Sequence, residues 1–391
     1  MRIAKVSASA HSHVFDKTAL SFGVGQNVKR DMVLVKVVAE DGTVGYGEAH
    51  HAMAPTAIAE IINHSLAPIV VGMDCLDREG VYDRIYRSQI QTHGTGTAAV
   101  ISASGIDIAL FDLAGKVLKQ PVYSLLGGGN KPSIAYAGGL SLGFQPLESL
   151  EREVQDYVDR GYKAIKLRVG QNVEIDAERV GHIRKAFGDS LKIAVDAATR
   201  YSILDIQAIG RYCEKYNVWW LEEPFTPDNI SAYKAMRRYT STPLAAGENH
   251  FTKQVFRELL REGAIDIVQA DCTKAGGITE VKKIADMASA YHVLVAPHTS
   301  QSVLSAAANL HLLAAIPNGL VHEADLAPVN PFRDQLAKNP ITVADGQAAP
   351  PVGFGLGLDI DEGCLNEMSA VPGPCYLPPQ VKVDAASSGS E

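Results

Sequence analysis

Three acidic residues recur at equal intervals of 26 residues in this chain, namely Asp196, Glu222 and Glu248. Each of them ends a short apolar run, in the segments KIAVDAA, VWWLEEP and PLAAGEN. A buried strand with the helix that follows it occupies roughly this length, so the spacing predicts successive parallel β-strands. Because parallel strands end at the same edge of their sheet, we expect the three carboxylates to converge there.

Three converging carboxylates repel one another and do not stay ionised together unless a cation lies among them. Ligation by oxygen alone selects a hard divalent cation, Mg²⁺ before Mn²⁺. The sequence therefore predicts a metal site formed by these three residues, and with it an enzyme. The alternative is that the acids only cap the helices after each strand. That alternative does not explain the other polar residues that end apolar runs at similar intervals along the chain.

Apolar runs recur at similar intervals both before and after these three acids. Downstream, runs end at Asp271, His298 and Glu323, after steps of 23, 27 and 25 residues. Upstream, the run YKAIKLRVG places Lys166 and Arg168 on one face of a strand, and SIAYAGGLSL predicts a strand earlier still. Eight such runs separated by helical stretches predict a (β/α)8 TIM barrel, whose chemistry lies at the C-terminal ends of its strands.

The N-terminal third of the chain has a different pattern. The segment MVLVKVVAEDGTVGYGEA alternates apolar and polar residues around Asp41 and Gly42, which predicts a β-hairpin. Helical segments follow at 56–72 and 98–120, before Pro121 and LLGGG mark a boundary. We therefore expect an α/β protein with three parts. These are an α+β capping domain over residues 1–125, the barrel over 126–345, and a Gly/Pro-rich segment over 346–391 that returns to the capping domain and ends in a frayed tail.

Residues 15–31, FDKTALSFGVGQNVKRD, are too polar and too rich in glycine for a core. We expect them to form a loop that closes over the barrel mouth when substrate binds, although a decorative surface loop would have the same composition. His50 and His51, which follow GYGEA at a strand end, and Phe22 in the loop are expected substrate contacts only through the family resemblance given below, and as surface residues they need no such role.

The composition excludes several classes of partner. The net charge of −8 and the lack of Lys/Arg runs argue against nucleic acid. The five cysteines are scattered without metal-binding spacing, which favours reduced thiols in a cytoplasmic protein. No apolar run reaches about 18 residues, so we expect no membrane span. The expected partner is a small molecule.

Residues 103–116, ASGIDIALFDLAGK, followed by PVYSLLGG, resemble the signature of the mandelate racemase/muconate lactonizing enzyme group of the enolase superfamily. The acids at 26-residue steps, the Lys-x-Arg strand, Asp271 and His298 also match that group. The resemblance implies a modified barrel under a capping domain, one Mg²⁺ per subunit, and a homo-oligomer between dimer and octamer. The reaction it implies is abstraction of the proton α to a substrate carboxylate.

The candidate base is His298. A carboxylate from Asp271 on one imidazole nitrogen would raise the basicity of the other, whereas a purely structural histidine is the alternative. Relatives that resemble mandelate racemase carry Lys-x-Lys, whose second lysine is a base, but this chain has Arg168 there. Arginine stays protonated at working pH, so we expect Arg168 to donate hydrogen bonds to substrate. Lys274, three residues beyond Asp271, is given no catalytic role.

Removing an α-proton next to a carboxylate creates an enediolate, whose oxygens require preformed positive charge. We expect Lys166 to provide charge beside the metal and Glu323 to provide a hydrogen bond. Whether Glu323 or His322 takes this position on the eighth strand stays open. Ala198 stands where many relatives have an asparagine two residues after the first ligand, so the surroundings of the metal differ here.

A single base on one face of the substrate favours dehydration over racemisation. The expected function is therefore that of an acid-sugar dehydratase, which converts an aldonate or aldarate, a hydroxylated carboxylate, to a 2-keto-3-deoxy acid. A cycloisomerase or epimerase acting on a sugar-derived acid is the alternative reaction. A relative that binds an acid sugar without catalysis is the alternative of another class.

Overall fold

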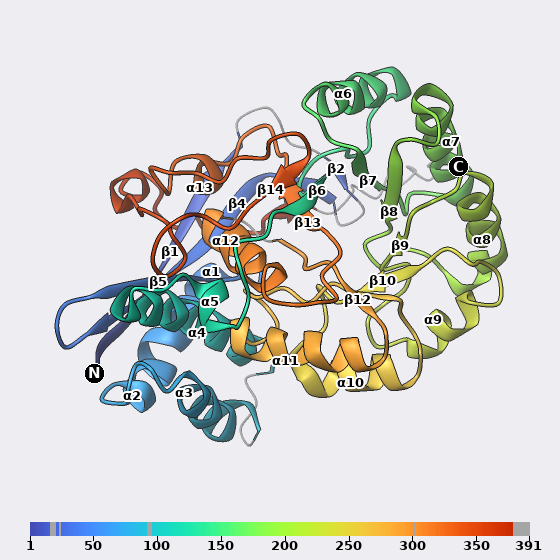
Figure 1. Cartoon of the computed structure of the whole chain (residues 1–391). Helices are drawn as coiled ribbons and strands as arrows, with labels where there is room; N and C mark the ends of the chain where they lie inside the picture. Colours follow the sequence, from blue (N-terminus) through green and yellow to red (C-terminus); the bar gives the residue numbers. More distant parts are fainter. Residues whose placement is uncertain (16–20, 23–24, 92–95, 300–301, 378–391) are drawn as a thin grey trace, which may run out of the picture.

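The computed structural model describes residues 1–15, 21–22, 25–91, 96–299 and 302–377, and Figure 1 shows a barrel beside a smaller domain. Eight parallel strands form the barrel within these residues. They are β6 (Ser133–Gly138), β7 (Ala164–Arg168), β8 (Lys192–Asp196), β9 (Leu221–Glu222), β10 (Leu244–Ala246), β11 (Ile267–Val268), β12 (Leu294–Val295) and β13 (His322–Asp325). Their order around the ring is β12-β11-β10-β9-β8-β7-β6-β13. A parallel bridge between Val295 and Gly319 closes the ring, and the (β/α)8 prediction is confirmed.

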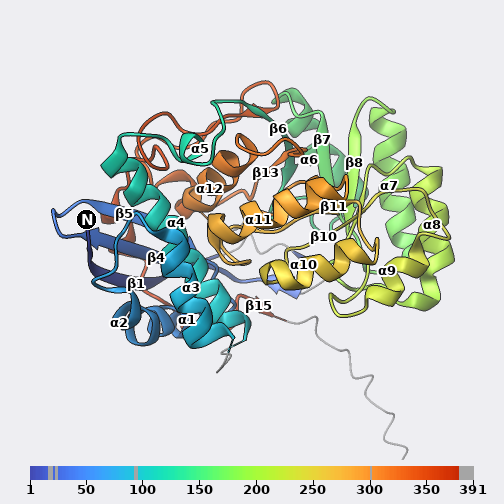
Figure 2. The ribbon, with the colours of Figure 1, turned by 60° about the horizontal axis from the view of Figure 1, so that its bottom comes forward.

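Helices alternate with these strands and form the outer layer of the barrel (Figure 2). They are α6 (Leu147–Asp159), α7 (Val173–Phe187), α8 (Ile206–Lys215), α9 (Ile230–Met236), α10 (Thr252–Arg261), α11 (Gly277–Ala290) and α12 (Val303–Leu313). Two short helices, α5 (Val122–Leu125) and α13 (Pro331–Asp334), flank this set. The helices return the chain to the same end of the sheet each time, so the strands run parallel.

Two layers of side chains fill the barrel from within. The lower layer is apolar and contains Tyr136, Ala164, Ala194, Trp220, Ala245, Ile267, Ala296 and Val321. Because side chains alternate between the two faces of a strand, the residue two positions further on points inward again, at the C-terminal end. Those positions hold Gly138, Lys166, Asp196, Glu222, Gly247, Gln269, His298 and Glu323. Five of the polar residues singled out from the sequence thus stand directly above an apolar floor, namely Lys166, Asp196, Glu222, His298 and Glu323.

The capping domain is built on an antiparallel sheet of β1 (Ile3–Val14), β4 (Lys29–Ala39) and β5 (Val44–Ala49), in the order β1-β4-β5. β4 and β5 pair from Val33–Ala49 to Val38–Val44, which confirms the predicted hairpin. Its helical elements are α1 (Pro55–Glu60), η1 (Ile61–Leu66), α2 (Ala67–Val70), α3 (Arg78–Ile85), η2 (Tyr86–Ile90) and α4 (Thr97–Leu118). They enclose a separate apolar core against this sheet.

Helix α4 packs closely on β5 because both contribute glycine to the contact. A Cβ atom on Gly47 would lie 2.3 Å from the carbonyl oxygen of Gly105, and one on Gly45 would lie 2.1 Å from that of Ala109. Both distances are far inside van der Waals contact. The glycines of the GYG segment therefore set how near the helix comes to the sheet.

Helix α4 also joins the parts of the protein. It is 22 residues long and by length and composition could cross a membrane, but 94% of its apolar window is buried inside the protein, so it is a core helix. Asp107 accepts hydrogen bonds from the backbone N–H and the hydroxyl of Thr279 in α11. Asp112 accepts from the backbone N–H groups of Tyr46 and Leu356. The acids of the 103–116 signature thus tie the capping domain to the barrel and to the C-terminal segment.

The C-terminal segment first adds β14 (Gln347–Ala348) to β6 of the barrel, in antiparallel pairing. Glu362 then accepts hydrogen bonds from Lys36 and from the hydroxyl of Tyr46 in the capping domain. Further on, β15 (Tyr376–Leu377) pairs with β3 (Gly25–Asn27), which pairs with β2 (Ser21–Phe22). The last described residues therefore share a small sheet with the segment expected to be a loop.

Part of residues 15–31 is not a loop. Lys29, Arg30 and Asp31 begin β4 and are only 3%, 2% and 0% exposed. Lys29 pairs with Asp31 at 2.9 Å, and Arg30 pairs with Asp325 at 2.9 Å. The expectation of a polar loop is wrong for these three residues, because Lys29 and Asp31 neutralise each other and Asp325, distant in sequence, neutralises Arg30. Residues 16–20 and 23–24 lie outside the described residues, so closure of the loop stays a prediction.

Candidate active site

The polar layer opens into a cavity of about 470 Å³ between the barrel mouth and the capping domain. Its lining includes His50, His51, Arg168, Glu248, Lys274 and His298. Arg30 of β4 and Tyr376 of β15 line it from the capping side. A concave site with convergent polar groups at this face of a barrel is where catalysis is expected.

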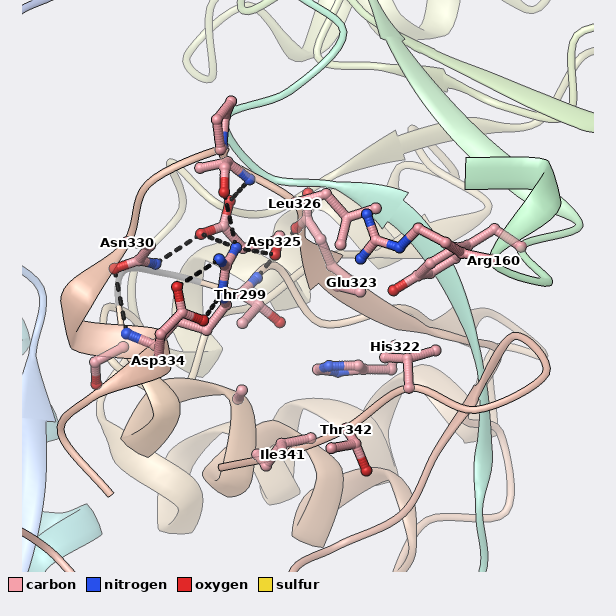
Figure 3. A pocket seen from close by; sticks show the side chains of 18 residues that line it. Arg160, Thr299, His322, Glu323, Asp325, Leu326, Asn330, Asp334, Ile341 and Thr342 are labelled. Atoms are coloured by element: carbon pink, nitrogen blue, oxygen red, sulfur yellow. Dashed lines mark hydrogen bonds and ion pairs between the residues drawn. The ribbon is translucent and has the colours of Figure 1, made fainter. Parts of the chain in front are cut away.

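A second cavity, of about 430 Å³, lies against β13 (Figure 3). His322 lies in this cavity, and burial lowers the pKa of its imidazole to about 4, so it is neutral. Glu323 extends to Lys166 instead, because consecutive residues of a strand face opposite sides. The structure therefore places Glu323, and not His322, in the polar layer of the barrel mouth.

Lys166 lies at the centre of the carboxylates. Its Nζ is 2.6 Å from Oε1 of Glu222, 2.9 Å from Oε1 of Glu323 and 3.5 Å from Oδ2 of Asp196. Burial alone would lower the pKa of Lys166, but Glu222 and Glu323 raise it well above its usual value. Arg168 pairs with Asp196 on the neighbouring strand, and its pKa is raised in the same way, against burial. Both cations on this side of the cavity are therefore protonated at neutral pH.

The donor chemistry fits a hard divalent cation. Asp196, Glu222 and Glu248 offer oxygen ligands only. Asp196, Glu222 and Glu323 pair with the permanent cations Lys166 and Arg168, and Glu248 pairs with His298. Burial, opposed by Lys166 and supported by the neighbouring acids, raises the pKa of Glu222 to about 7. A surplus of carboxylate charge is what Mg²⁺ neutralises.

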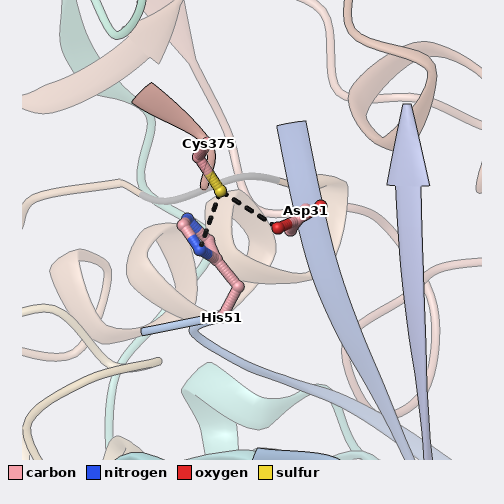
Figure 4. Close-up of side chains that lie close together, drawn as sticks. All are labelled: Asp31, His51 and Cys375. Atoms are coloured by element: carbon pink, nitrogen blue, oxygen red, sulfur yellow. Dashed lines mark hydrogen bonds between the residues drawn. The ribbon is translucent and has the colours of Figure 1, made fainter. Parts of the chain in front are cut away.

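The ligand atoms of Asp196, Glu222 and Glu248 do not all lie within 4.8 Å of one another. In the described chain the set of side chains that meets this distance is Asp31, His51 and Cys375 (Figure 4). These atoms already have protein partners. The thiol of Cys375 donates to Oδ2 of Asp31 at 3.0 Å, Lys29 pairs with the same oxygen, and the backbone N–H of Met53 donates to Nδ1 of His51. Burial raises the pKa of the Cys375 thiol, so it stays protonated. The cluster fastens the C-terminal segment to β4.

His298 stands between two carboxylates. Its Nδ1 is 2.8 Å from Oδ2 of Asp271, and its Nε2 is 3.0 Å from Oε2 of Glu248. Burial alone would lower the pKa of the imidazole, but Glu248 and Asp271 raise it well above its usual value. Asp271 is itself oriented by the backbone N–H and the hydroxyl of Thr273, both 2.7 Å from Oδ1. The structure thus brings together the predicted base and its predicted orienting acid.

Two of the three residues expected to contact substrate lie at the cavity. His50 and His51 line the cavity and stack on each other with ring centroids 4.2 Å apart. Burial lowers the pKa of His51 to about 4 and that of His50 well below its usual value, so both are neutral hydrogen-bonding groups. The backbone of Phe22 belongs to β2, but its side chain lies outside what the structure describes.

Ala198 keeps the first proposed ligand in place through its backbone. Its φ is 45°, and that of Thr199 is 64°, both in the left-handed region. In this conformation the N–H of Ala198 donates to Oδ1 of Asp196 at 2.8 Å. The asparagine expected from the family resemblance is therefore not needed to orient this carboxylate, and the short side chain leaves room in the cavity that it lines.

Sequence reasoning missed two cations of the cavity. Arg30 was assigned to a mobile loop, yet it lines the cavity from β4 and pairs with Asp325. Lys274 was given no role, yet it lines the cavity and is only 6% exposed. The KRD triplet at the start of an apolar strand was a usable signal for Arg30. A polar residue directly after a barrel strand was a weaker signal for Lys274.

Two family models match this chain. The mandelate racemase/muconate lactonizing enzyme N-terminal domain matches residues 9–127, and the enolase C-terminal domain-like model matches residues 149–364. The chain belongs to the mandelate racemase/muconate lactonizing enzyme family of the enolase superfamily. The resemblance seen in the sequence is confirmed.

Curated relatives of this family member act on sugar acids and their lactones. The arabinonate dehydratase of Saccharolobus solfataricus is 34% identical and covers 88% of this chain and 95% of its own length. The D-galactarolactone cycloisomerase of Agrobacterium fabrum is 29% identical and covers 87% of this chain and 91% of its own length. The chain is therefore an enzyme, similar to hydro-lyases and to an isomerase.

Solved structures share the whole architecture. An enolase superfamily member from Polaromonas sp. JS666 has a TM-score of 0.94 at 41% identity, and covers 96% of this chain and 100% of its own. A racemase from Streptomyces coelicolor A3(2) with bound magnesium has a TM-score of 0.85 at 26% identity, and covers 94% of this chain and 100% of its own. The modified barrel with its N-terminal cap is thus common to this chain and these proteins.

Proposed function

We propose that this enzyme removes the proton α to the carboxylate of a sugar acid and then eliminates the β-hydroxyl as water. The enol that results would tautomerise to a 2-keto-3-deoxy acid. The asymmetry of the cavity carries the proposal: on one side the imidazole of His298, with Nδ1 2.8 Å from Asp271, can pass between its neutral and protonated forms, whereas Lys166 and Arg168 on the other side hold their protons. The dehydratases among the relatives support the same reaction.

The substrate carboxylate would lie beside Lys166, Arg168 and the acids of the barrel mouth. Mg²⁺, when bound by Asp196, Glu222 and Glu248, supplies positive charge at the carboxylate oxygens that gain charge as the α-proton leaves. Lys166 adds a buried permanent charge at the same place, and Glu323, which holds Lys166 at 2.9 Å, fixes its position.

His298 would accept the α-proton on Nε2, because Asp271 engages Nδ1, whereas Glu248, which lies 3.0 Å from Nε2, would turn to the metal as one of its proposed ligands. The electron pair of the C–H bond then forms the enediolate, and its collapse breaks the bond between the β-carbon and its hydroxyl oxygen. The imidazolium can return the proton to this oxygen if both lie on one face, so that water leaves and no further reactant is needed. One base thus serves both half-reactions.

Two alternatives share the first step. A cycloisomerase would use the same enediolate with an oxygen of the substrate as the leaving or attacking group, and the Agrobacterium relative favours keeping this possibility. An epimerase requires a second base on the opposite face, where Arg168 and Lys166 hold their protons. A non-catalytic sugar-acid-binding protein would not need the Asp271–His298 pair.

The test is a panel of five- and six-carbon aldonic and aldaric acids, offered to the enzyme with Mg²⁺ in deuterated water. Formation of a 2-keto acid would support dehydration, and a rearranged product that retains the elements of water would support a cycloisomerase or epimerase. His298→Asn should abolish both turnover and exchange of the α-proton. Exchange at the wild-type rate in this variant would place the base elsewhere, and a lack of exchange with every acid would favour a non-catalytic role.

A further inference from the structure

Lys274 lies in the turn that follows β11, three residues beyond Asp271. Its backbone N–H donates to the carbonyl oxygen of Asp271 at 3.0 Å, which fixes the turn beside the proposed catalytic pair. The side chain lines the active-site cavity, and the residue is only 6% exposed. A primary ammonium group is therefore held at the wall of the cavity and is mostly withdrawn from solvent.

The other cations of this cavity each have a carboxylate partner. Arg168 pairs with Asp196, and Arg30 pairs with Asp325 at 2.9 Å. Lys166, just below, pairs with Glu222 and Glu323. Lys274 has no carboxylate within 4.0 Å and no hydrogen bond from its ammonium group within the described part of the chain, although it is near enough to Glu248 and Glu223 to lower their pKa values. An ammonium group that is mostly buried and has no direct ion pair can pair with the carboxylate of a ligand in the cavity.

The position of Lys274 in the ring shows which part of a substrate it would meet. Lys166 and Arg168 belong to β7, whereas Lys274 follows β11, four places away in a ring of eight strands. The two groups of cations therefore face each other across the barrel mouth. Lys274 lies close to His50 and His51 of the capping domain. Its positive charge helps to lower the pKa of both imidazoles, although burial is the largest cause. An acid anchored at Lys166 would extend its far end toward Lys274.

We propose that Lys274 binds the second carboxylate of a dicarboxylic sugar acid, so that this enzyme acts on aldarates in preference to aldonates. The inference rests on the proposed function, because it assumes that the reacting carboxylate lies beside Lys166. A monocarboxylic acid would leave the ammonium group buried and unpaired, and an unpaired charge in the site discriminates more strongly than a missing apolar contact. His50 and His51, stacked and neutral, would meet the hydroxyl groups next to this carboxylate.

The test compares aldarates with the aldonates of the same length and stereochemistry, on the wild-type enzyme and on Lys274→Met. The wild-type enzyme should prefer the aldarate, and Lys274→Met should reduce the ratio of kcat/KM values for aldarate over aldonate by about 100-fold. Lys274→Arg should retain part of the preference. Lys282→Gln, on α11 with an exposed ion pair to Asp286, is the matched control and should leave the ratio unchanged.

Two measurements that do not need turnover complete the design. Titration calorimetry of the His298→Asn variant should show tighter binding of the aldarate than of the aldonate, and the added Lys274→Met change should remove the difference. Because Lys274 has no direct ion pair within the described residues, Lys274→Met should not lower the urea midpoint of unfolding. A lower midpoint would indicate a structural role and would contradict the proposal.

The outcomes separate this inference from the proposed function. If aldonates react as well as aldarates, or if Lys274→Met slows both alike, the role of Lys274 is refuted while the α-proton chemistry stands. If neither class of acid exchanges its α-proton, the proposed function itself fails, and this assignment fails with it.

Discussion

Replacement of Asp271 by asparagine changes the tautomer of His298 without removing the contact between the two residues. Oδ1 of Asp271 accepts two hydrogen bonds from Thr273, one from its backbone N–H and one from its hydroxyl, each of 2.7 Å. The asparagine must keep its carbonyl oxygen toward these donors, because an amide nitrogen there would face two N–H or O–H groups. Its NH2 group then points at Nδ1 of His298, where the carboxylate oxygen stood at 2.8 Å.

A hydrogen bond donated to Nδ1 requires that the proton of the neutral imidazole lies on Nε2. That nitrogen is the one expected to accept the α-proton, so the variant holds the base in its inactive tautomer. The same change in Ser-His-Asp triads lowers kcat by about 10⁴-fold with the geometry intact. A similar loss is expected here, and it corresponds to about 5.5 kcal/mol of transition-state stabilisation.

The assay is kcat for 2-keto acid formation together with the rate of α-deuterium exchange, on whichever sugar acid the wild-type enzyme accepts. The ¹⁵N chemical shifts of the His298 ring report the tautomer independently of activity. Asp286→Asn, an exposed acid near the end of α11, is the matched control. Activity within tenfold of the wild type, or a ring that keeps its proton on Nδ1, would refute the argument.

Three further predictions concern the metal, acid stability and the cap. Glu222→Gln should weaken Mg²⁺ binding in titration calorimetry, because an amide oxygen carries no charge; unchanged affinity would remove Glu222 from the ligand set. Burial lowers the pKa of His311 to about 4, so this residue stays neutral in the folded protein. In the unfolded chain its pKa is about 6.5, so its contribution to stability is present above pH 6.5 and is lost as the pH falls toward 4. Between pH 8 and pH 5, protonation of His311 in the unfolded chain should lower the free energy of unfolding by about 2 kcal/mol. The urea midpoint of His311→Gln should therefore fall less steeply with pH than that of the wild type, and equal falls would contradict the lowered pKa of His311. Gly47→Ala should lower the free energy of unfolding by about 1–3 kcal/mol, because its Cβ would lie 2.3 Å from the carbonyl oxygen of Gly105, whereas Gly129→Ala, with no atom within 4 Å, should change it little.

The barrel and the polar residues at its mouth could be predicted because the local sequence marks where each strand ends. Apolar runs stop at Asp196, Glu222 and Glu248, and the repeat length allows one arrangement of parallel strands in which these ends meet. The dyad of Asp271 and His298 followed from the same logic, since both residues end neighbouring strands.

What the sequence did not show depends on contacts between distant parts of the chain. Arg30 looked like a loop residue because its partner, Asp325, lies 295 positions away. Lys274 looked unimportant because nothing in its local sequence reveals that its ammonium group is buried without a carboxylate. Burial of charge is decided by the tertiary fold, so a local pattern cannot report it.

The small sheet of β2, β3 and β15 makes the end of the chain part of the substrate side of the molecule. Tyr376 in β15 lines the cavity, and Cys375 before it is fastened to Asp31 beneath the same wall. Residues 375–377 therefore hold one wall of the cavity in place and have no contact with the carboxylates of the barrel strands among the interactions of the described residues. Substitutions in this segment can therefore change the shape of the cavity without altering the proposed metal ligands or the Asp271–His298 pair.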